Sequence, residues 1–205
     1  MTRLGLLLVA LAFLGGLVIF FPVIKKEIGY RFKKPNENTP VASSELDSMR
    51  FFGQDDVIIA KDPLFSIIIP KIAANSKVIA DVDPNDSKVY QVALTKGVAH
   101  AKGTSYPGEF GNSFYFAHSS DNFYNANRYN SVFYLLNKME TGDFFYLVYE
   151  NWVYKYIVTE VSVVKPDDIK YMENDTNKKT ATLMTCWPAG TTISRLVVVG
   201  NLAEK

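Results

Sequence analysis

A few polar side chains in the C-terminal half of the sequence have the types and spacing that thiol chemistry requires. The chain contains one cysteine, Cys186, two histidines, His100 and His118, and an arginine, Arg195, nine positions after the cysteine. A cysteine attacks a carbonyl carbon as the thiolate, and because a free thiol has a pKa of about 8.5, it needs a base or a cation nearby. These residues are candidates for a nucleophile, a base and a charge-stabilising group.

The surroundings of the two histidines favour His118 as the base. His118 follows the apolar run 113–117 and precedes the polar run 119–122, which predicts a strand end where a loop begins. Site residues are often found at such loop starts on a rigid scaffold. His100 lies in residues 97–101 with no predicted strand before it. A surface or hydrogen-bonded structural role is the alternative for either histidine.

Cys186 ends one β-type run, and Arg195 begins the next. A Pro/Gly loop, Trp187-Pro188-Ala189-Gly190, follows the cysteine. If the two runs pair as antiparallel strands, Cys186 and Arg195 face each other, and the guanidinium can stabilise the thiolate or an oxyanion. The spacing also leaves open a buried structural cysteine beside a salt-bridging arginine, because cysteine is among the most buried residue types.

The elements that must position these residues are mainly strands. The 12 Tyr and 14 Phe, together with Val, Ile and Thr runs, suit half-buried pleated surfaces. Many short strands between turn-forming residues are typical of a barrel or a sandwich. One short amphipathic helix is predicted before Gly142, with core residues Val132, Phe133, Leu135 and Leu136 at helical spacing. The predicted strands are 64–69, 77–80, 114–117, 144–149, 153–164, 181–186 and 195–199.

The N-terminal part of the chain is apolar. From Leu4 to Ile24, 21 residues carry no charge, which at about 1.5 Å per residue is long enough to cross a hydrocarbon core of about 30 Å. No small-x-small cleavage site follows, which favours an uncleaved anchor over a signal peptide. We predict a transmembrane anchor over residues 1–25, a polar linker over 26–61 and one folded domain over 62–205.

The charges beside this anchor bear on its orientation. Only Arg3 and the free amine precede it, whereas five basic residues follow it between Lys25 and Lys34. The positive-inside tendency would place the C-terminal side in the cytoplasm. The motifs described below imply the opposite orientation, with the folded domain outside the cell.

Composition argues against several classes of function. A net charge of +1 and a charged fraction of 21% provide no dense basic face, so we expect no nucleic-acid partner. One cysteine and two histidines 18 positions apart form no zinc-ligand cluster, and no Gly-x-x-x-x-Gly-Lys motif for phosphate binding occurs. We therefore predict neither a metal nor a cofactor.

Several motifs between about residues 67 and 199 resemble those of the sortase family. Thr182-Leu183-Met184-Thr185-Cys186 resembles the family's Thr-Leu-x-Thr-Cys motif, Ala117-His118 its catalytic histidine and Arg195 its arginine. Residues 68–72 are similar to its first core strand. The Cys-x-Pro-x-Gly pattern and the nine-residue step to the arginine most resemble the pilus-type class C.

This resemblance implies a closed eight-stranded β-barrel with one or a few short helices, and a catalytic site of His118, Cys186 and Arg195. It also suggests Thr185 and Thr104 as substrate-binding residues. The implied activity is that of a cysteine transpeptidase, which cleaves an LPxTG-like sorting signal on a surface protein through a Cys186 thioacyl intermediate. The implied acceptor is an amine, either of a cell-wall peptide or of a pilin lysine. The implied location is the cell membrane, with a single-pass anchor and an extracellular domain.

Two alternatives come from other readings of the same residues. An L,D-type cell-wall transpeptidase also uses Cys and His on a β scaffold, but its Ser-x-Gly-Cys-x-Arg pattern is missing around Cys186. A catalytically silent, membrane-tethered domain with a sortase-like fold is the other alternative. The presence of Cys, His and Arg together argues against a silent domain.

Overall fold

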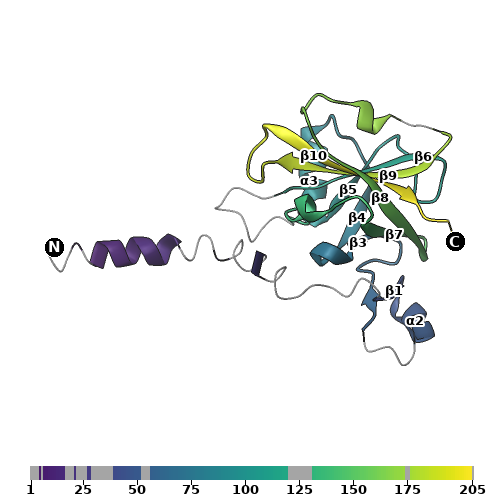
Figure 1. The fold of residues 1–205 in the computed structure, drawn as a ribbon, viewed down its shortest axis with the longest axis horizontal. Helices are drawn as coiled ribbons and strands as arrows, with labels where there is room; N and C mark the ends of the chain where they lie inside the picture. Colours follow the sequence, from purple (N-terminus) through teal and green to yellow (C-terminus); the bar gives the residue numbers. More distant parts are fainter. Residues whose placement is uncertain are drawn as a thin grey trace.

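The apolar and β-branched runs of the sequence form a closed barrel. This computed structural model describes residues 5, 7–16, 21, 27–28, 39–51, 56–119, 131–173 and 176–204. Eight strands close in the order β10-β8-β7-β3-β4-β5-β6-β9 (Figure 1). The eight-stranded, mainly β fold is therefore confirmed. The strands are β3 (Phe65–Ile69), β4 (Ala74–Val82), β5 (Val98–Ala101), β6 (Gly111–Phe116), β7 (Phe144–Tyr149), β8 (Trp152–Val164), β9 (Lys179–Trp187) and β10 (Ser194–Leu202).

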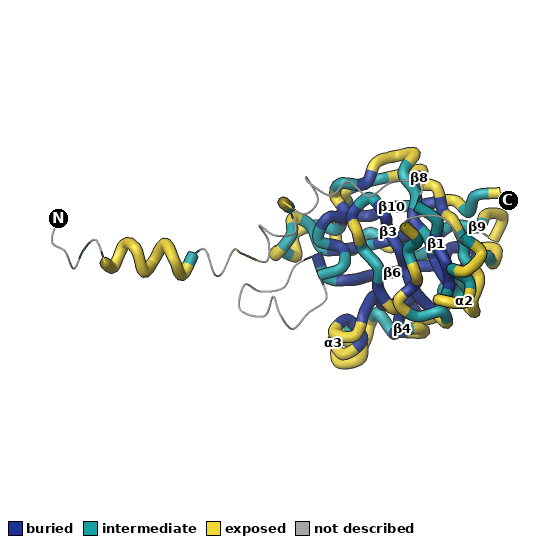
Figure 2. Tube along the Cα trace, turned by 90° about the horizontal axis from the view of Figure 1, so that it is seen from below, coloured by how far each residue is buried: buried dark blue, intermediate teal, exposed yellow. Residues whose placement is uncertain are grey.

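The hydrophobic core fills the barrel. Buried residues follow the strands, and exposed residues lie mainly on the helices and loops around them (Figure 2). Phe145 and Tyr156, on neighbouring strands, stack with ring centroids 5.5 Å apart and an interplanar angle of 8°. Large apolar side chains such as Ile67, Leu147 and Leu183 are fully buried. Each of the predicted strands overlaps a barrel strand, whereas β5 was not predicted from the sequence.

A ten-residue helix, α3 (Ser87–Lys96), connects β4 to β5. These strands are parallel, so a crossover connection is required between them. The Asp86 carboxylate caps the helix by accepting a hydrogen bond from the Lys88 N–H at 3.0 Å. Ala93 and Leu94 form its buried face. The sequence prediction did not include this helix.

The segment predicted as an amphipathic helix forms tight turns instead. Only η3 (Leu136–Lys138) is helical, and it is a 3-10 turn. The Leu136 N–H donates to the Phe133 carbonyl at 3.1 Å and the Lys138 N–H to the Leu135 carbonyl at 2.9 Å, both three residues back. The prediction of an α-helix was wrong, because these hydrogen bonds close three residues back and the segment forms consecutive tight turns, which bury Phe133, Leu135 and Leu136. Their prediction as core residues is confirmed.

Residues 41–51 and 56–60, within the predicted linker, carry small elements that pack on the barrel. β1 (Val41–Ala42) pairs in parallel with β2 (Ile58–Ile59), and α2 (Glu45–Ser48) and η1 (Met49–Phe51) follow β1. Two further 3-10 turns, η2 (Pro70–Ile72) and η4 (Lys170–Met172), follow β3 and β8. A second apolar cluster joins the β1–β2 sheet to β3 and β7 through Val41, Ala60, Ile68 and Val148.

The predicted membrane-spanning segment lies in part outside the described residues. Of residues 4–24, the structure describes 5, 7–16 and 21, and residues 7–16 are helical. Within the described ranges, no helix is both long enough and apolar enough to span a membrane. The anchor over residues 1–25 stays a prediction.

Candidate active site

The register of β9 and β10 places Cys186 directly opposite Arg195. This confirms the antiparallel pairing that the sequence suggested, and opposite residues on antiparallel strands have Cβ atoms about 4.5–5.5 Å apart. The loop between the strands holds the guanidinium, because Arg195 Nη1 donates to the carbonyls of Thr192 at 3.2 Å and Ser194 at 3.1 Å. The sequence could not predict these two acceptors, because every residue has a backbone carbonyl and no residue type marks the ones that bind the guanidinium.

His118 reaches the same end of the barrel from β6. This strand pairs in parallel with β9, and the last registered pair is Phe116 with Met184. The Ala117 N–H then donates to the Met184 carbonyl at 3.2 Å. His118 and Cys186 each stand two positions after that pair, so both lie at the same end of these neighbouring strands.

Three consecutive strands thus contribute one residue each to this end of the barrel. Cys186 on β9 lies between the His118 position after β6 and the Arg195 position on β10. All three side chains are half-buried. A thiol flanked by a titratable imidazole and a fixed cation has the groups needed for nucleophilic attack and for stabilising an oxyanion.

His100 has a structural environment. It is fully buried on β5, and its Nε2 lies 3.1 Å from the Ser105 carbonyl oxygen and 3.1 Å from Thr104 Oγ1. Burial lowers the pKa of His100 below its usual value of 6.5, although the contact with Ser105 opposes this shift. Its ring packs against Tyr106, with centroids 4.8 Å apart. This geometry agrees with the choice of His118 as the candidate base.

Acidification is expected to destabilise the fold through His100. Burial lowers the pKa of His100 in the folded state, so the unfolded chain, with a value near 6.5, takes up the proton first as pH falls. The free energy of unfolding therefore decreases below about pH 6.5, where the unfolded state binds more protons. Denaturant unfolding at about pH 7.5 and pH 5.5 should show a larger loss in the parent chain than in His100→Gln. Equal losses would contradict this role.

Thr104 and Thr185 use their hydroxyl groups inside the protein. Thr104 follows β5, which runs away from His118, and its Oγ1 donates to the Ala101 carbonyl at 2.8 Å. Thr185 is 3% exposed, and its Oγ1 donates to the Ala117 carbonyl at 2.8 Å. Both hydroxyls therefore have an acceptor inside the protein, and the substrate-binding role that the resemblance suggested for these residues stays a prediction.

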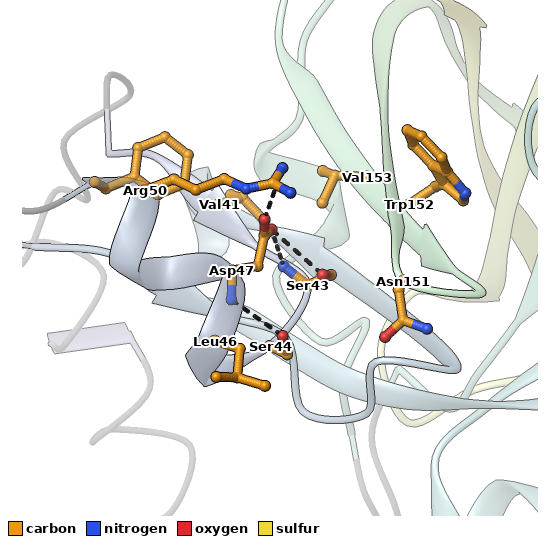
Figure 3. A pocket seen from close by; sticks show the side chains of 10 residues that line it. Val41, Ser43, Ser44, Leu46, Asp47, Arg50, Asn151, Trp152 and Val153 are labelled. Carbon is orange, nitrogen blue, oxygen red and sulfur yellow. Dashed lines mark hydrogen bonds and ion pairs between the residues drawn. The ribbon is translucent and has the colours of Figure 1, made fainter.

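A pocket of about 650 Å³ lies far from these residues, beside the β7–β8 turn (Figure 3). The Asp47 carboxylate within it accepts from the Ser43 N–H at 3.0 Å and pairs with Arg50 at 3.1 Å. The turn joins the start of β8 at Trp152, whereas Arg195 pairs with Val164 at the end of β8. The length of β8 therefore separates this pocket from the Cys186 site.

Comparisons with known proteins identify the family. A family model described as Sortase domain matches residues 67–203. A lid mutant of sortase A from Corynebacterium diphtheriae is 28% identical with a TM-score of 0.59, over 69% of this chain and 70% of that one. Sortase C1 from Streptococcus suis is 27% identical, TM-score 0.59, over 69% and 73% of the two chains. Sortase C from Streptococcus pneumoniae is 27% identical, TM-score 0.58, over 68% and 67%. Among curated proteins, none matches the chain significantly.

The matched region contains His118, Cys186 and Arg195 and covers most of the barrel. The solved relatives include both sortase A and sortase C proteins. The chain therefore belongs to the sortase family of cysteine transpeptidases.

Proposed function

We propose that the chain is a membrane-anchored sortase that cleaves an LPxTG-like sorting signal and joins the cleaved protein to an amine. The observation that carries this proposal is the strand register, which sets Arg195 opposite Cys186 and brings the end of β6, with His118, beside them. Membership of the sortase family supports the class of reaction.

In the first half of the reaction, Cys186 becomes acylated. Its thiolate attacks the carbonyl carbon of the Thr–Gly bond, so that a C–S bond forms and the carbonyl oxygen becomes an oxyanion. Arg195 donates hydrogen bonds to this oxyanion. When the C–N bond breaks, the His118 imidazolium gives its proton to the leaving glycine amine. The products are a thioacyl enzyme and a peptide with a free N-terminal glycine.

In the second half, an amine takes the acyl group. The amine nitrogen attacks the thioester carbonyl, a C–N bond forms, and the C–S bond breaks to release the Cys186 thiolate. His118 takes the proton from the attacking amine, which restores the starting protonation states. We propose a cell-wall peptide or a pilin lysine as the acceptor. The class C resemblance of the Cys-to-Arg loop supports the pilin.

For its location, we propose a single-pass anchor over residues 1–25, a linker over 26–61 and an extracellular catalytic domain over 62–205. The uncharged run of residues 4–24 and the surface location of sorting-signal proteins support this arrangement. Protease added to intact cells is expected to digest the catalytic domain. Protection of the domain until the cells are broken would contradict the orientation.

Transpeptidation with defined substrates tests the proposed function. The chain is incubated with a library of fluorescent LPxTG-type peptides and a primary amine acceptor, with scrambled peptides as the control. The expected product carries the acceptor amine on the threonine carbonyl. Binding of the peptides with neither ligation nor hydrolysis would instead favour the catalytically silent alternative.

Arg195 is expected to contribute mainly to the rate of the chemical step. We predict that Arg195→Ala lowers kcat by about 10²–10³-fold, because the oxyanion loses its donors. Arg195→Lys should recover only part of this loss, since lysine keeps the charge but lacks the planar fork of donors. Steady-state kinetics with a sorting-signal peptide measure the effect, and an unchanged kcat in Arg195→Ala would rule out the role.

A further inference from the structure

We propose that Thr185 is a positioning residue, which holds His118 beside Cys186 through the backbone carbonyl of Ala117. The inference rests on the proposed function for the roles of His118 and Cys186. It starts from the contact that Thr185 makes inside the protein.

One hydrogen bond joins the two residues that directly precede the candidate nucleophile and the candidate base. Thr185 Oγ1 donates to the Ala117 carbonyl at 2.8 Å, across 68 positions of sequence. That carbonyl belongs to the peptide unit whose nitrogen is the backbone nitrogen of His118. Since a peptide unit is planar, the bond fixes the orientation in which the chain enters His118.

The bond lies where the regular pairing of β6 with β9 stops. The last registered pair is Phe116 with Met184, and a single backbone bond follows, from the Ala117 N–H to the Met184 carbonyl at 3.2 Å. The Thr185 hydroxyl adds the next link between the strands. This link therefore sets their separation immediately before His118 and Cys186.

Threonine suits this position for two reasons. Its side chain is stiff at χ1, so the hydroxyl is held in one direction, and a buried hydroxyl needs a hydrogen-bond partner. Successive side chains of a strand point to opposite faces, so Thr185, which is 3% exposed, faces the interior while Cys186 faces the other side. The hydroxyl can orient the backbone of His118 without occupying the space of a substrate.

The same strand provides a matched control, Thr182. It is 2% exposed, and its Oγ1 donates to Asn112 Oδ1 at 2.9 Å. This bond also links β9 to β6, but its acceptor, Asn112, lies near the start of β6 and away from His118. Replacing either threonine with valine removes one buried hydroxyl and preserves the shape of the side chain.

The experiment compares Thr185→Val, Thr185→Ser and Thr182→Val in the full chain. The measurements are the pH midpoint of Cys186 alkylation by iodoacetamide, kcat and KM for a sorting-signal peptide, and the melting temperature. Misplacement of a catalytic group by about 1 Å can cost about 10²-fold in rate, so we expect a loss of that order in kcat for Thr185→Val, with little change in KM. Its alkylation midpoint should move upward, whereas Thr185→Ser should stay close to the parent chain.

Thr182→Val is expected to lower the melting temperature and leave both the midpoint and kcat close to those of the parent. The proposal is overturned if Thr185→Val behaves like Thr182→Val in both the midpoint and kcat, or if Thr185→Ser loses as much as Thr185→Val. Should Thr185→Val not fold, the smaller Thr185→Ala carries the same comparison. Alkylation needs no peptide substrate, so it tests Thr185 even if the parent chain cleaves no sorting signal, a result that would count against the proposed function instead.

Discussion

Replacing Cys186 with alanine is expected to abolish both cleavage and ligation of a sorting-signal peptide, with a loss of at least about 10³-fold in kcat. No other cysteine occurs in the chain, so no second thiol can form the thioester. Cys186 is half-buried at the end of β9, and its removal leaves the barrel core intact. Peptide cleavage followed by chromatography measures the loss.

The control for this variant is its stability. Cys186→Ala should melt close to the parent chain, because the side chain lies outside the main buried cluster. Cys186→Ser, which preserves size, should be as inactive as the alanine variant, since a hydroxyl is a far weaker nucleophile than a thiolate. Turnover near that of the parent in either variant would mean that Cys186 is not the nucleophile.

Replacing His118 with alanine is expected to have the next largest effect, a loss of about 10²–10⁴-fold in kcat. Without the imidazole, the leaving amine loses the acid that protonates it and the attacking amine loses its base. The pH dependence of kcat should flatten as well, because the titrating acid and base is gone. Steady-state kinetics from about pH 5.5 to pH 9 measure both effects.

His100→Ala is the matched control for His118→Ala. Removal of the buried His100 ring takes away a hydrogen-bond partner of Thr104 and leaves a cavity beside Tyr106. We therefore expect a lower free energy of unfolding, by about 1–3 kcal/mol, and a nearly parental kcat where the variant is folded. A larger loss of kcat in folded His100→Ala than in His118→Ala would contradict the assignment of the base.

The long strands could be predicted from the sequence because their β-branched and aromatic runs are distinctive. The predicted bounds of β7, 144–149, coincide with the observed strand, and those of β8 differ by one residue. β5 escaped prediction because its residues Val98–Ala101 are few, mostly small and all buried, so no alternation marks them. A short, fully buried strand gives little periodic signal.

The helices were harder to predict because tertiary contacts decide them. In α3, the β-branched Val89 and Val92 are exposed while Ala93 and Leu94 are buried. The apolar residues of this segment therefore do not mark a single buried helix face. The capping residue Asp86 was a usable signal, but it also belongs to a run of turn-forming residues. Around η3, local apolar spacing suggested an α-helix, whereas burial of adjacent residues favoured tight turns.

The two halves of the candidate site differ in how far sequence predicts them. Cys186 and Arg195 flank one short loop, so hairpin pairing alone places them opposite each other. The position of His118 depends on the parallel register of β6 with β9, which are distant in sequence and whose alignment no local pattern fixes. The direction of the Thr185 hydroxyl depends on the same register, which explains why its internal contact could not be predicted.

Trapping of the acyl-enzyme tests directly whether Cys186 is the nucleophile. The chain is incubated with a sorting-signal peptide in the absence of an amine acceptor, digested at low pH and analysed by mass spectrometry. We predict a mass increase equal to the acyl part of the peptide, on the fragment that contains Cys186 and removable by hydroxylamine. Cleavage of the peptide with the acyl group on any other residue, or with no covalent adduct, would contradict the claim that Cys186 is the nucleophile of this site.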